Sequence, residues 1–121
     1  MGESILKNKS FDFALAIVQT YKYLNSLGEY VMSKQLLRSG TSIGANIAEA
    51  NMAQSTADFS AKMFIAQKEA SETRYWLELL YRSGYITQAS AQELLAQCVE
   101  LINMLVATTK KTSPRLHGQH A

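Results

Sequence analysis

Apolar residues recur along the chain in steps of three and four, the spacing of one face of an α-helix. Four such runs are separated by short breaks, and each break contains glycine, serine or asparagine. The pattern predicts helices over about 11–27, 30–51 and 56–84, and a fourth that runs from a cap at Thr87 or Ser90 to about 109. Short connections place sequential helices antiparallel, so we expect an all-α, up-down-up-down antiparallel four-helix bundle.

The apolar residues of each run define the stripe that should face the core. In the third and fourth runs this stripe alternates steps of four and three, as in bundles packed near the left-handed coiled-coil angle. Leu95 and Ile102 widen the fourth stripe. In chain order, the expected core positions are Phe11, Ala14, Leu15, Val18, Tyr21 and Leu24; Leu36, Gly40, Ile43, Ile47 and Ala50; Phe59, Met63, Ala66, Ala70, Thr73, Leu77 and Leu80; and Leu94, Cys98, Leu101 and Leu105.

The second run contains the unusual stretch RSGTSIGANIAEAN, residues 38–51. Gly40, Gly44 and Ala48 are spaced four apart, so they form a strip of small residues along one side of the helix. Each glycine costs about 1 kcal/mol relative to alanine in a helix interior. Close approach of a neighbouring backbone would offset that cost.

A polar stripe follows the same helix. At about 100° per residue, Arg38, Ser42, Asn46 and Glu49 fall within a sector of roughly 80°. One interpretation is a ligand or partner site built from a guanidinium, a hydroxyl, an amide and a carboxylate. The other, which we favour, is a solvated face or a hydrogen-bond network between helices, because every helix surface must be polar somewhere.

The third run carries a second apolar face opposite its core stripe. A helix that is apolar on two faces is buried on two faces, and one bundle has a single core. Either the N-terminal segment covers this second face, through Ile5 and Leu6, or a second subunit does. Aromatic residues are enriched at interfaces, so we predict a subunit interface there. Its residues are Phe64, Ile65, Tyr75, Trp76 and Leu79, interrupted by Lys68, Ser71 and Glu72.

Glu72 needs a partner inside such a patch, and Arg38 or Arg74 would supply it.

No constellation of catalytic residues is present. The chain has no HExxH, no CxxC and no glycine-rich phosphate loop after a strand. Cys98 lies in an apolar helical pattern with no histidine in the helical body, which favours a buried thiol over a nucleophile. His117 and His120 sit near the end of the chain and are a weak signal for a metal. We expect no enzymatic activity, cofactor or metal site.

The basic residues are unevenly distributed. The chain has 12 basic and 10 acidic residues, and Lys110, Lys111 and Arg115 lie near its end. Without these three, residues 1–109 carry 9 basic and 10 acidic residues, a net charge of −1. We therefore divide the chain into a bundle domain, 1–109, and a flexible basic tail, 110–121. Lys110, Lys111 and Arg115 are the candidate nucleic-acid contacts.

No apolar run is long enough to span a bilayer, and the first residues lack the apolar segment of a secretory signal. No membrane association is expected, and the expected location is the cytoplasm.

The stretch SKQLLRSGTSIGANIAEA, followed downstream by IAQKEASETRYWLELLYRSGYI, resembles a family of four-helix bundle proteins encoded in intervening sequences of bacterial 23S ribosomal RNA genes. The same family includes the accessory variability protein of diversity-generating retroelements. The family usually has glycine after the motif glutamate, where this chain has Ala50, so we expect the helix to continue to Asn51. The most specific matches are Arg38, Ser39, Ser42, Ile43, Asn46, Ile47 and Glu49, with Glu72 and Leu77 further along.

The resemblance implies a ring-shaped homopentamer without enzymatic activity. It also implies an association with RNA, or with a reverse transcriptase and its nucleic acid. The ribosomal label of the family reflects gene location, so it does not make this chain a ribosomal protein. We expect a non-catalytic homo-oligomer that binds RNA, DNA or a nucleoprotein, and the alternative is a protein-interaction or scaffold module that binds no nucleic acid.

Overall fold

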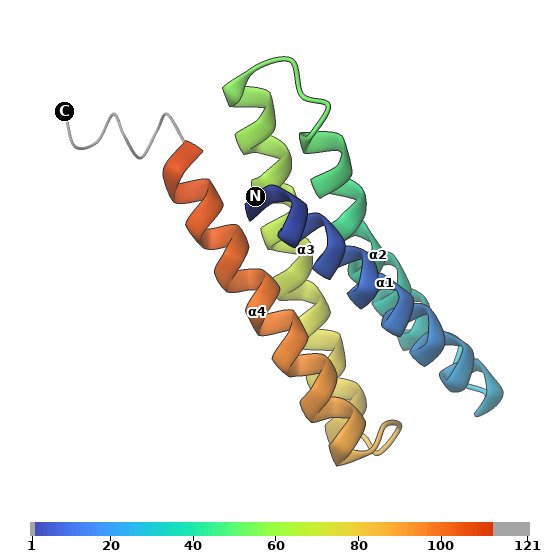
Figure 1. The fold of residues 1–121 in the computed structure, drawn as a ribbon. Helices are drawn as coiled ribbons and strands as arrows, with labels where there is room; N and C mark the ends of the chain where they lie inside the picture. The colour runs from blue at the N-terminus through green and yellow to red at the C-terminus, as the bar shows by residue number, and fades with distance from the viewer. Residues whose placement is uncertain (1, 113–121) are drawn as a thin grey trace.

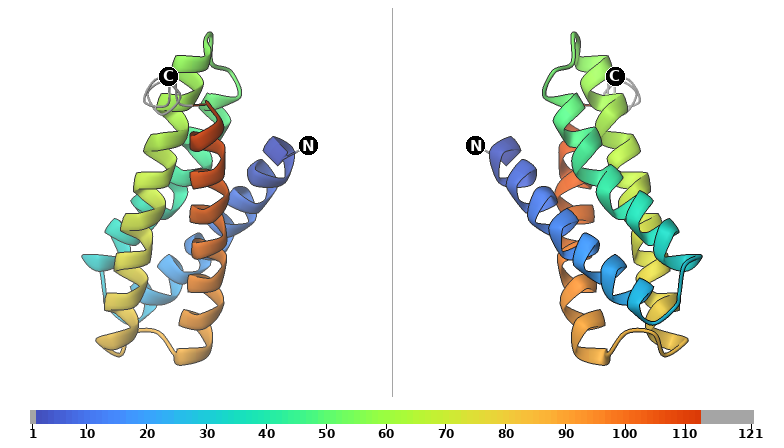
Figure 2. Two further views of the ribbon diagram at one scale, coloured as in Figure 1. Left: turned by 90° about the vertical axis from the view of Figure 1, so that its left-hand side faces the viewer. Right: turned by 90° about the vertical axis from the view of Figure 1, so that its right-hand side faces the viewer.

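The structure, a computed structural model, describes residues 2–112 and consists of four α-helices with short connections (Figure 1). No strand occurs within this range. The predicted all-α four-helix bundle is confirmed. Helices α2, α3 and α4 run side by side, whereas α1 crosses the bundle obliquely and its N-terminal end diverges from it (Figure 2). The bounds are α1 Gly2–Ser26, α2 Met32–Ala50, α3 Thr56–Arg82 and α4 Gln88–Thr112.

The buried side chains form one core between the helices. The core stripes predicted for α2 and α4 are buried at every named position except Leu95 and Ile102, which are half-buried and pack against the core. The stripe of α3 is buried as well, except that Phe59 is half-buried beside the buried Ser60. Periodicity therefore identified the inner faces of three helices, each of which has one dominant apolar stripe.

The core stripe predicted for α1 is right at Leu24, which is fully buried, but wrong at Phe11 and Leu15. Phe11 and Leu15 are 64% and 52% exposed, whereas Phe13 and Ile17 are fully buried. Helix α1 also begins nine residues before the predicted start, and this extension adds Leu6 to the core. The helix has two apolar stripes, and the one beginning at Phe11 faces outward.

The small-residue strip of α2 determines which stripe of α1 is buried. A Cβ atom on Gly40 would lie 2.8 Å from both Cγ1 and Cγ2 of Ile17, and one on Gly44 would lie 3.4 Å from the carbonyl oxygen of Ser10. Helix α1 therefore crosses α2 directly over the two glycines. The close approach expected of this strip is confirmed for both glycines, while Ala48 at its far end is exposed.

A buried carboxylate caps the N-terminus of α2. Both Glu29 oxygens accept backbone hydrogen bonds, from Val31 and Met32 at 3.2 Å each and from Ser33 at 2.7 Å. These N–H groups have no partner within the helix, and the helix dipole favours a negative charge beside them. Burial alone would raise the pKa of Glu29, but the three backbone donors outweigh it and hold the pKa below its ordinary value of 4.5. This cap was not predicted from the sequence.

Replacing Glu29 with glutamine is expected to lower the free energy of unfolding by about 1–2 kcal/mol at pH 7, since the charge at the helix N-terminus is removed. Because the folded-state pKa is lowered, the stabilisation is present above about pH 5 and is lost as the pH falls through the folded-state pKa. Urea denaturation between pH 7 and pH 3 should show the difference between the two proteins shrinking. Glu93→Gln, on an exposed side of α4, is the matched control. A difference that stays constant with pH would contradict the cap.

The remaining helix ends are set by local turn chemistry. Ser55 caps α3 by accepting from the backbone N–H of Asp58 at 3.0 Å, a role that serine favours just before a helix. Thr87, rather than Ser90, caps α4, since its hydroxyl accepts from the Ser90 N–H at 3.2 Å. Helix α2 ends at Ala50, one residue before the expected Asn51, which follows as the C-cap with a right-handed φ of −66°.

Helix α4 continues past 109 to Thr112, which places Lys110 and Lys111 in its last turn. Arg115, His117 and His120 lie outside the described residues. Within the described range, none of the helices has the length and apolar character needed to cross a membrane.

Candidate functional site

The guanidinium of Arg38 joins α2 to α3. Its Nη1 donates to Glu69 Oε1 at 2.8 Å, and its Nη2 donates to Glu72 Oε2. The same Glu72 oxygen accepts from Trp76 Nε1 at 2.9 Å. The Trp76 hydrogen bond, together with that from Arg38, lowers the pKa of Glu72 and keeps it ionised. Of the two partners considered for Glu72, the structure selects Arg38.

The other members of the polar stripe also have partners within the chain. Glu49 forms an ion pair with Lys62 of α3 at 3.0 Å. Ser42 donates to the carbonyl oxygen of Arg38 at 2.6 Å, and Asn46 donates to that of Ser42 at 2.8 Å. The two ends of the stripe therefore connect α2 to α3, and its middle bonds to the preceding turn of α2. Within this chain, these contacts form a network between α2 and α3.

A buried hydroxyl pair lies beneath this network. Thr73 Oγ1 of α3 is 2.9 Å from Ser39 Oγ of α2, and both residues are fully buried. Thr73 also donates to the carbonyl oxygen of Glu69 at 2.8 Å. No buried side-chain nitrogen or oxygen in the described part of the chain lacks a partner, so the polar contacts between α2 and α3 are satisfied internally.

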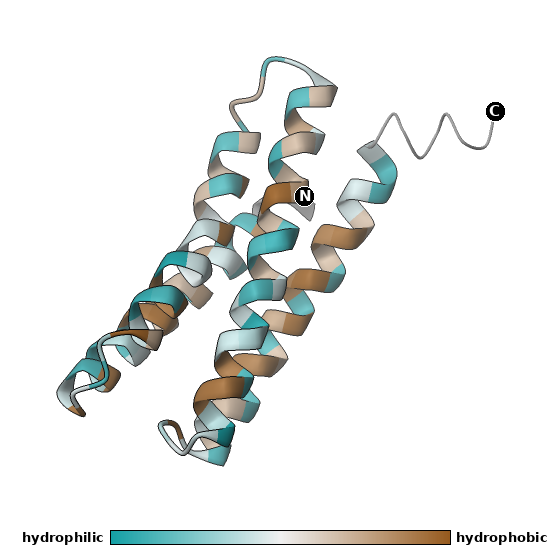
Figure 3. Cartoon of the chain, turned by 180° about the vertical axis from the view of Figure 1, so that it is seen from behind, coloured by the Kyte–Doolittle hydropathy of each residue, from teal (hydrophilic) through white to brown (hydrophobic). Residues whose placement is uncertain are grey.

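The outward side of α3 is uncovered. We call Phe64, Ile65, Tyr75 and Leu79 the α3 outer face, and each is between 36% and 59% exposed. Leu6 does not cover it, since Leu6 belongs to the core on α1. Coverage by the N-terminal segment is therefore wrong. Figure 3, which views the molecule from behind, shows hydrophobic bands on α3 among hydrophilic ones.

Trp76 belongs only partly to this face. It is half-buried and packs against the core, and its ring meets that of Tyr75 edge-on with centroids 5.1 Å apart. Tyr75, which is 59% exposed, is the more prominent aromatic residue of the surface.

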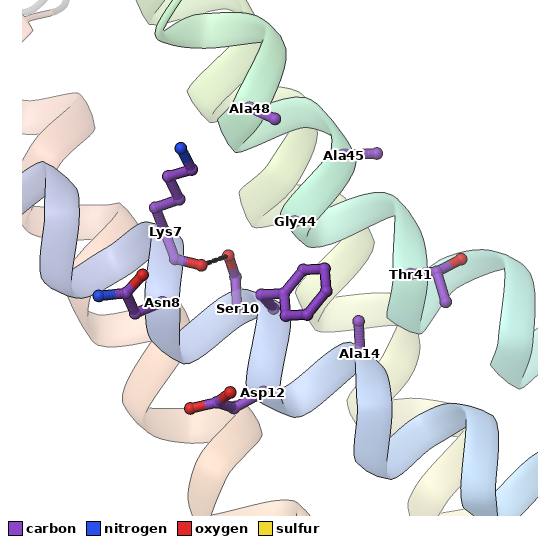
Figure 4. A pocket seen from close by; sticks show the side chains of 10 residues that line it. Lys7, Asn8, Ser10, Asp12, Ala14, Thr41, Gly44, Ala45 and Ala48 are labelled. Carbon is purple, nitrogen blue, oxygen red and sulfur yellow. Dashed lines mark hydrogen bonds between the residues drawn. The ribbon is translucent and has the colours of Figure 1, made fainter.

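A second uncovered surface is a groove between α1 and α2 (Figure 4), with a volume of about 670 Å³. We call it the α1–α2 groove. It was not predicted, because periodicity assigns Phe11, which lies on its edge, to the core. The signal in the sequence was the cluster of small residues on the same side of α2. Its α2 side is lined by Thr41, Gly44, Ala45 and Ala48, and Lys7 and Phe11 of α1 line its edge. The carboxylate of Asp12 lies on the other side of α1, toward α4 (Figure 4).

The single cysteine of the chain is buried in the core. Cys98 is fully buried, its thiol donates to the carbonyl oxygen of Ala70 at 3.2 Å, and burial raises its pKa to about 12. Such a thiol is not a nucleophile near neutral pH. No group of three histidine, cysteine, aspartate or glutamate residues within 2–112 could hold a metal ion.

The chain is similar to known proteins both in sequence and in structure. A family model described as 23S rRNA-intervening sequence protein matches residues 3–107. Among solved structures, the chain is similar to the crystal structure of a protein of unknown function from the S23 ribosomal protein family of Bacteroides thetaiotaomicron. The two sequences are 52% identical, the match covers 91% of this chain and 99% of the other, and the TM-score is 0.89. None of the curated proteins is significantly similar to the chain.

Proposed function

Since the chain belongs to the family of 23S rRNA-intervening sequence proteins, we propose that it is a non-catalytic helical bundle that works as a homo-oligomer. The observation that carries the proposal is the α3 outer face, where four large apolar side chains stay exposed on a helix whose inner face is fully buried. Burying such a face in a second copy removes apolar surface from water. The family resemblance favours a ring of five copies.

Tyr75→Glu is expected to convert the protein largely to monomer, because it places a charge at the most exposed point of the α3 outer face. Light scattering should give a mass well above 13.4 kDa for the unmodified protein and a mass near 13.4 kDa for the variant. Trp76 is less suitable, since it also packs against the core and bonds to Glu72.

Tyr30→Glu is the matched control, because Tyr30 is 58% exposed in the connection between α1 and α2. It should leave the mass unchanged. A monomeric unmodified protein would refute self-association.

Binding of RNA, DNA or a nucleoprotein is the second candidate function. Lys110 and Lys111 lie together in the last turn of α4, and Arg115 follows close by in the sequence. One copy offers few phosphate contacts, and residues 1–109 carry a net charge of −1. An oligomer would present several such basic clusters to one nucleic acid, so that their contributions reinforce one another.

An electrophoretic shift titration with structured RNA at several salt concentrations tests this function. We expect micromolar or tighter binding that weakens as salt rises. Replacing Lys110, Lys111 and Arg115 with glutamine should lower the affinity, and the salt slope should fall by about 0.7–0.9 for each phosphate that is no longer neutralised. The control is a double variant, Lys22→Gln and Lys34→Gln, at exposed positions on α1 and α2.

Absence of binding at low salt would exclude this function. The alternative is then a protein-interaction or scaffold module, for which a pull-down should return a protein partner that nuclease treatment does not release.

A further inference from the structure

Large apolar side chains project from the connection between α1 and α2. This connection, residues 27–31, contains three of them: Leu27 is 51% exposed, Tyr30 58% and Val31 74%. We call these three residues the α1–α2 tip. In Figure 1 the connection is the corner at the lower right, at the opposite end of the bundle from the last turn of α4.

The connection between α3 and α4 places its apolar residues differently. It contains Tyr85 and Ile86, of which Ile86 is buried in the core and Tyr85 packs against it. Apolar side chains in a connection gain free energy by folding back in this way, because they leave water. The α1–α2 tip instead keeps all three of its apolar side chains on the surface.

The backbone of this connection holds the tip outward. Gly28 turns the chain with a φ of +83°, and the carboxylate of Glu29 points inward to accept the first N–H groups of α2. The only charged side chain of the connection is therefore buried, while its apolar side chains face the solvent. Hydration alone would favour the reverse arrangement, so the exposed tip indicates a partner.

The charges that flank the tip are positive. Lys22 on α1 and Lys34 on α2 are both exposed, and neither forms an ion pair with any residue in the described part of the chain. From residue 13 to residue 48, the buried Glu29 is the only acidic residue. At the end of α3, Glu78 is paired with Arg82 at 3.5 Å. The tip and its two lysines therefore suit an apolar surface that carries negative charge.

A lipid surface matches these features together. Projecting apolar side chains enter the boundary of the acyl chains, tyrosine is enriched at the membrane–water interface, and lysine is attracted to anionic headgroups. A protein partner would instead need a concave apolar pocket matched to the corner. The expectation of no membrane association rested on the lack of a spanning run and of a secretory segment, and a surface contact requires neither.

We propose that the α1–α2 tip inserts into the surface of a membrane that contains anionic lipids. Leu27 and Val31 enter the apolar boundary, Tyr30 lies at the interface, and Lys22 and Lys34 contact the headgroups. The last turn of α4, at the opposite end of the bundle, then faces away from the bilayer. The proposal depends neither on self-association nor on nucleic-acid binding.

Sedimentation of the full chain with vesicles tests the insertion. The unmodified protein should bind vesicles of phosphatidylcholine and phosphatidylglycerol in equal amounts about tenfold more tightly than vesicles of phosphatidylcholine alone. Replacing all three tip residues with serine should weaken binding to the anionic vesicles by more than about tenfold, because their apolar surface is no longer buried. Met52→Ser is the matched control, since Met52 is 83% exposed in the connection between α2 and α3, and it should bind as the unmodified protein does.

Charge variants separate insertion of the tip from adsorption of the basic residues near the end of the chain. The double variant Lys22→Gln and Lys34→Gln should bind the anionic vesicles about tenfold more weakly. Replacing Lys110, Lys111 and Arg115 with glutamine should leave vesicle binding unchanged. The opposite ranking of these two variants would overturn the proposal.

Fluorescence gives an independent measure of insertion. Tyr30→Trp should retain binding, and its emission should shift to shorter wavelength when anionic vesicles are added, because the indole enters a less polar environment. The unmodified protein, whose only tryptophan is the half-buried Trp76, is the reference. Binding without such a shift would overturn insertion of the tip.

Three further outcomes would overturn the proposal. The first is that the unmodified protein binds neither kind of vesicle. The second is that the triple serine variant, with its helical content confirmed by circular dichroism, binds as well as the unmodified protein. The third is that the triple variant changes the mass of the protein without lipid, which would show that the tip packs against another copy. The tests of the α3 outer face and of RNA binding contain no lipid, so they stand or fall separately.

Discussion

Replacing Phe13 with alanine is expected to lower the free energy of unfolding by about 3–5 kcal/mol, whereas the same change at Phe11 should alter it by less than about 0.5 kcal/mol. Phe13 is fully buried in the core, so truncation removes its packing interactions and leaves a cavity. Phe11 is 64% exposed at the edge of the α1–α2 groove, where truncation leaves no cavity. The two phenylalanines lie two residues apart on one helix and are a matched pair.

Urea denaturation should be carried out at low protein concentration, because the proposed self-association would stabilise the protein in a concentration-dependent way. Phe13→Leu, which leaves a smaller cavity, should give an intermediate decrease and serves if Phe13→Ala does not fold. A larger decrease at Phe11 than at Phe13 would contradict the observed orientation of α1 and support the orientation expected from periodicity.

Gly40→Ala is expected to lower the free energy of unfolding by about 1–3 kcal/mol, although alanine is the better helix former by about 1 kcal/mol. The added methyl group would lie 2.8 Å from two carbons of Ile17. Ile17 is fully buried and β-branched, so its side chain has little freedom to move aside. Helix α1 would have to shift away from α2.

Gly44→Ala is the matched control on the same helix. Its methyl group would lie 3.4 Å from Ser10, an ordinary contact, so the better helix propensity should prevail and stability should stay constant or rise by up to about 1 kcal/mol. Thermal and urea denaturation would compare the two variants. In an Ile17→Ala background, Gly40→Ala should cost less. A gain in stability from Gly40→Ala in the unmodified protein would show that the close contact is wrong.

The polar stripe illustrates what a single helix can and cannot indicate about a site. The alignment of Arg38, Ser42, Asn46 and Glu49 along α2 follows from helix geometry alone. The acceptors of Arg38, however, lie 31 and 34 residues further along the chain. The hydrogen-bond partners of Arg38 therefore depend on how α2 and α3 pack together. In the folded protein this packing makes the polar stripe a connection between the two helices.

The α1–α2 groove was not predicted for a similar reason. Its floor and its edge come from different helices, and neither helix signals a groove by itself. The α3 outer face could be recognised from the sequence because it lies on a single helix. Helical spacing shows that α3 has one apolar stripe for the core and a second on the opposite side.

The sequence by itself determined the number of helices, most of their ends, and the inner faces of α2, α3 and α4. These features depend on periodicity and on caps such as Ser55, which act within a few residues. Only the tertiary structure decided the orientation of α1. That helix has two apolar stripes, both of which satisfy helical spacing, and the choice between them is made by packing. Ile17 fits against Gly40, where a neighbouring helix can approach closely, and this contact turns Phe13 inward and Phe11 outward.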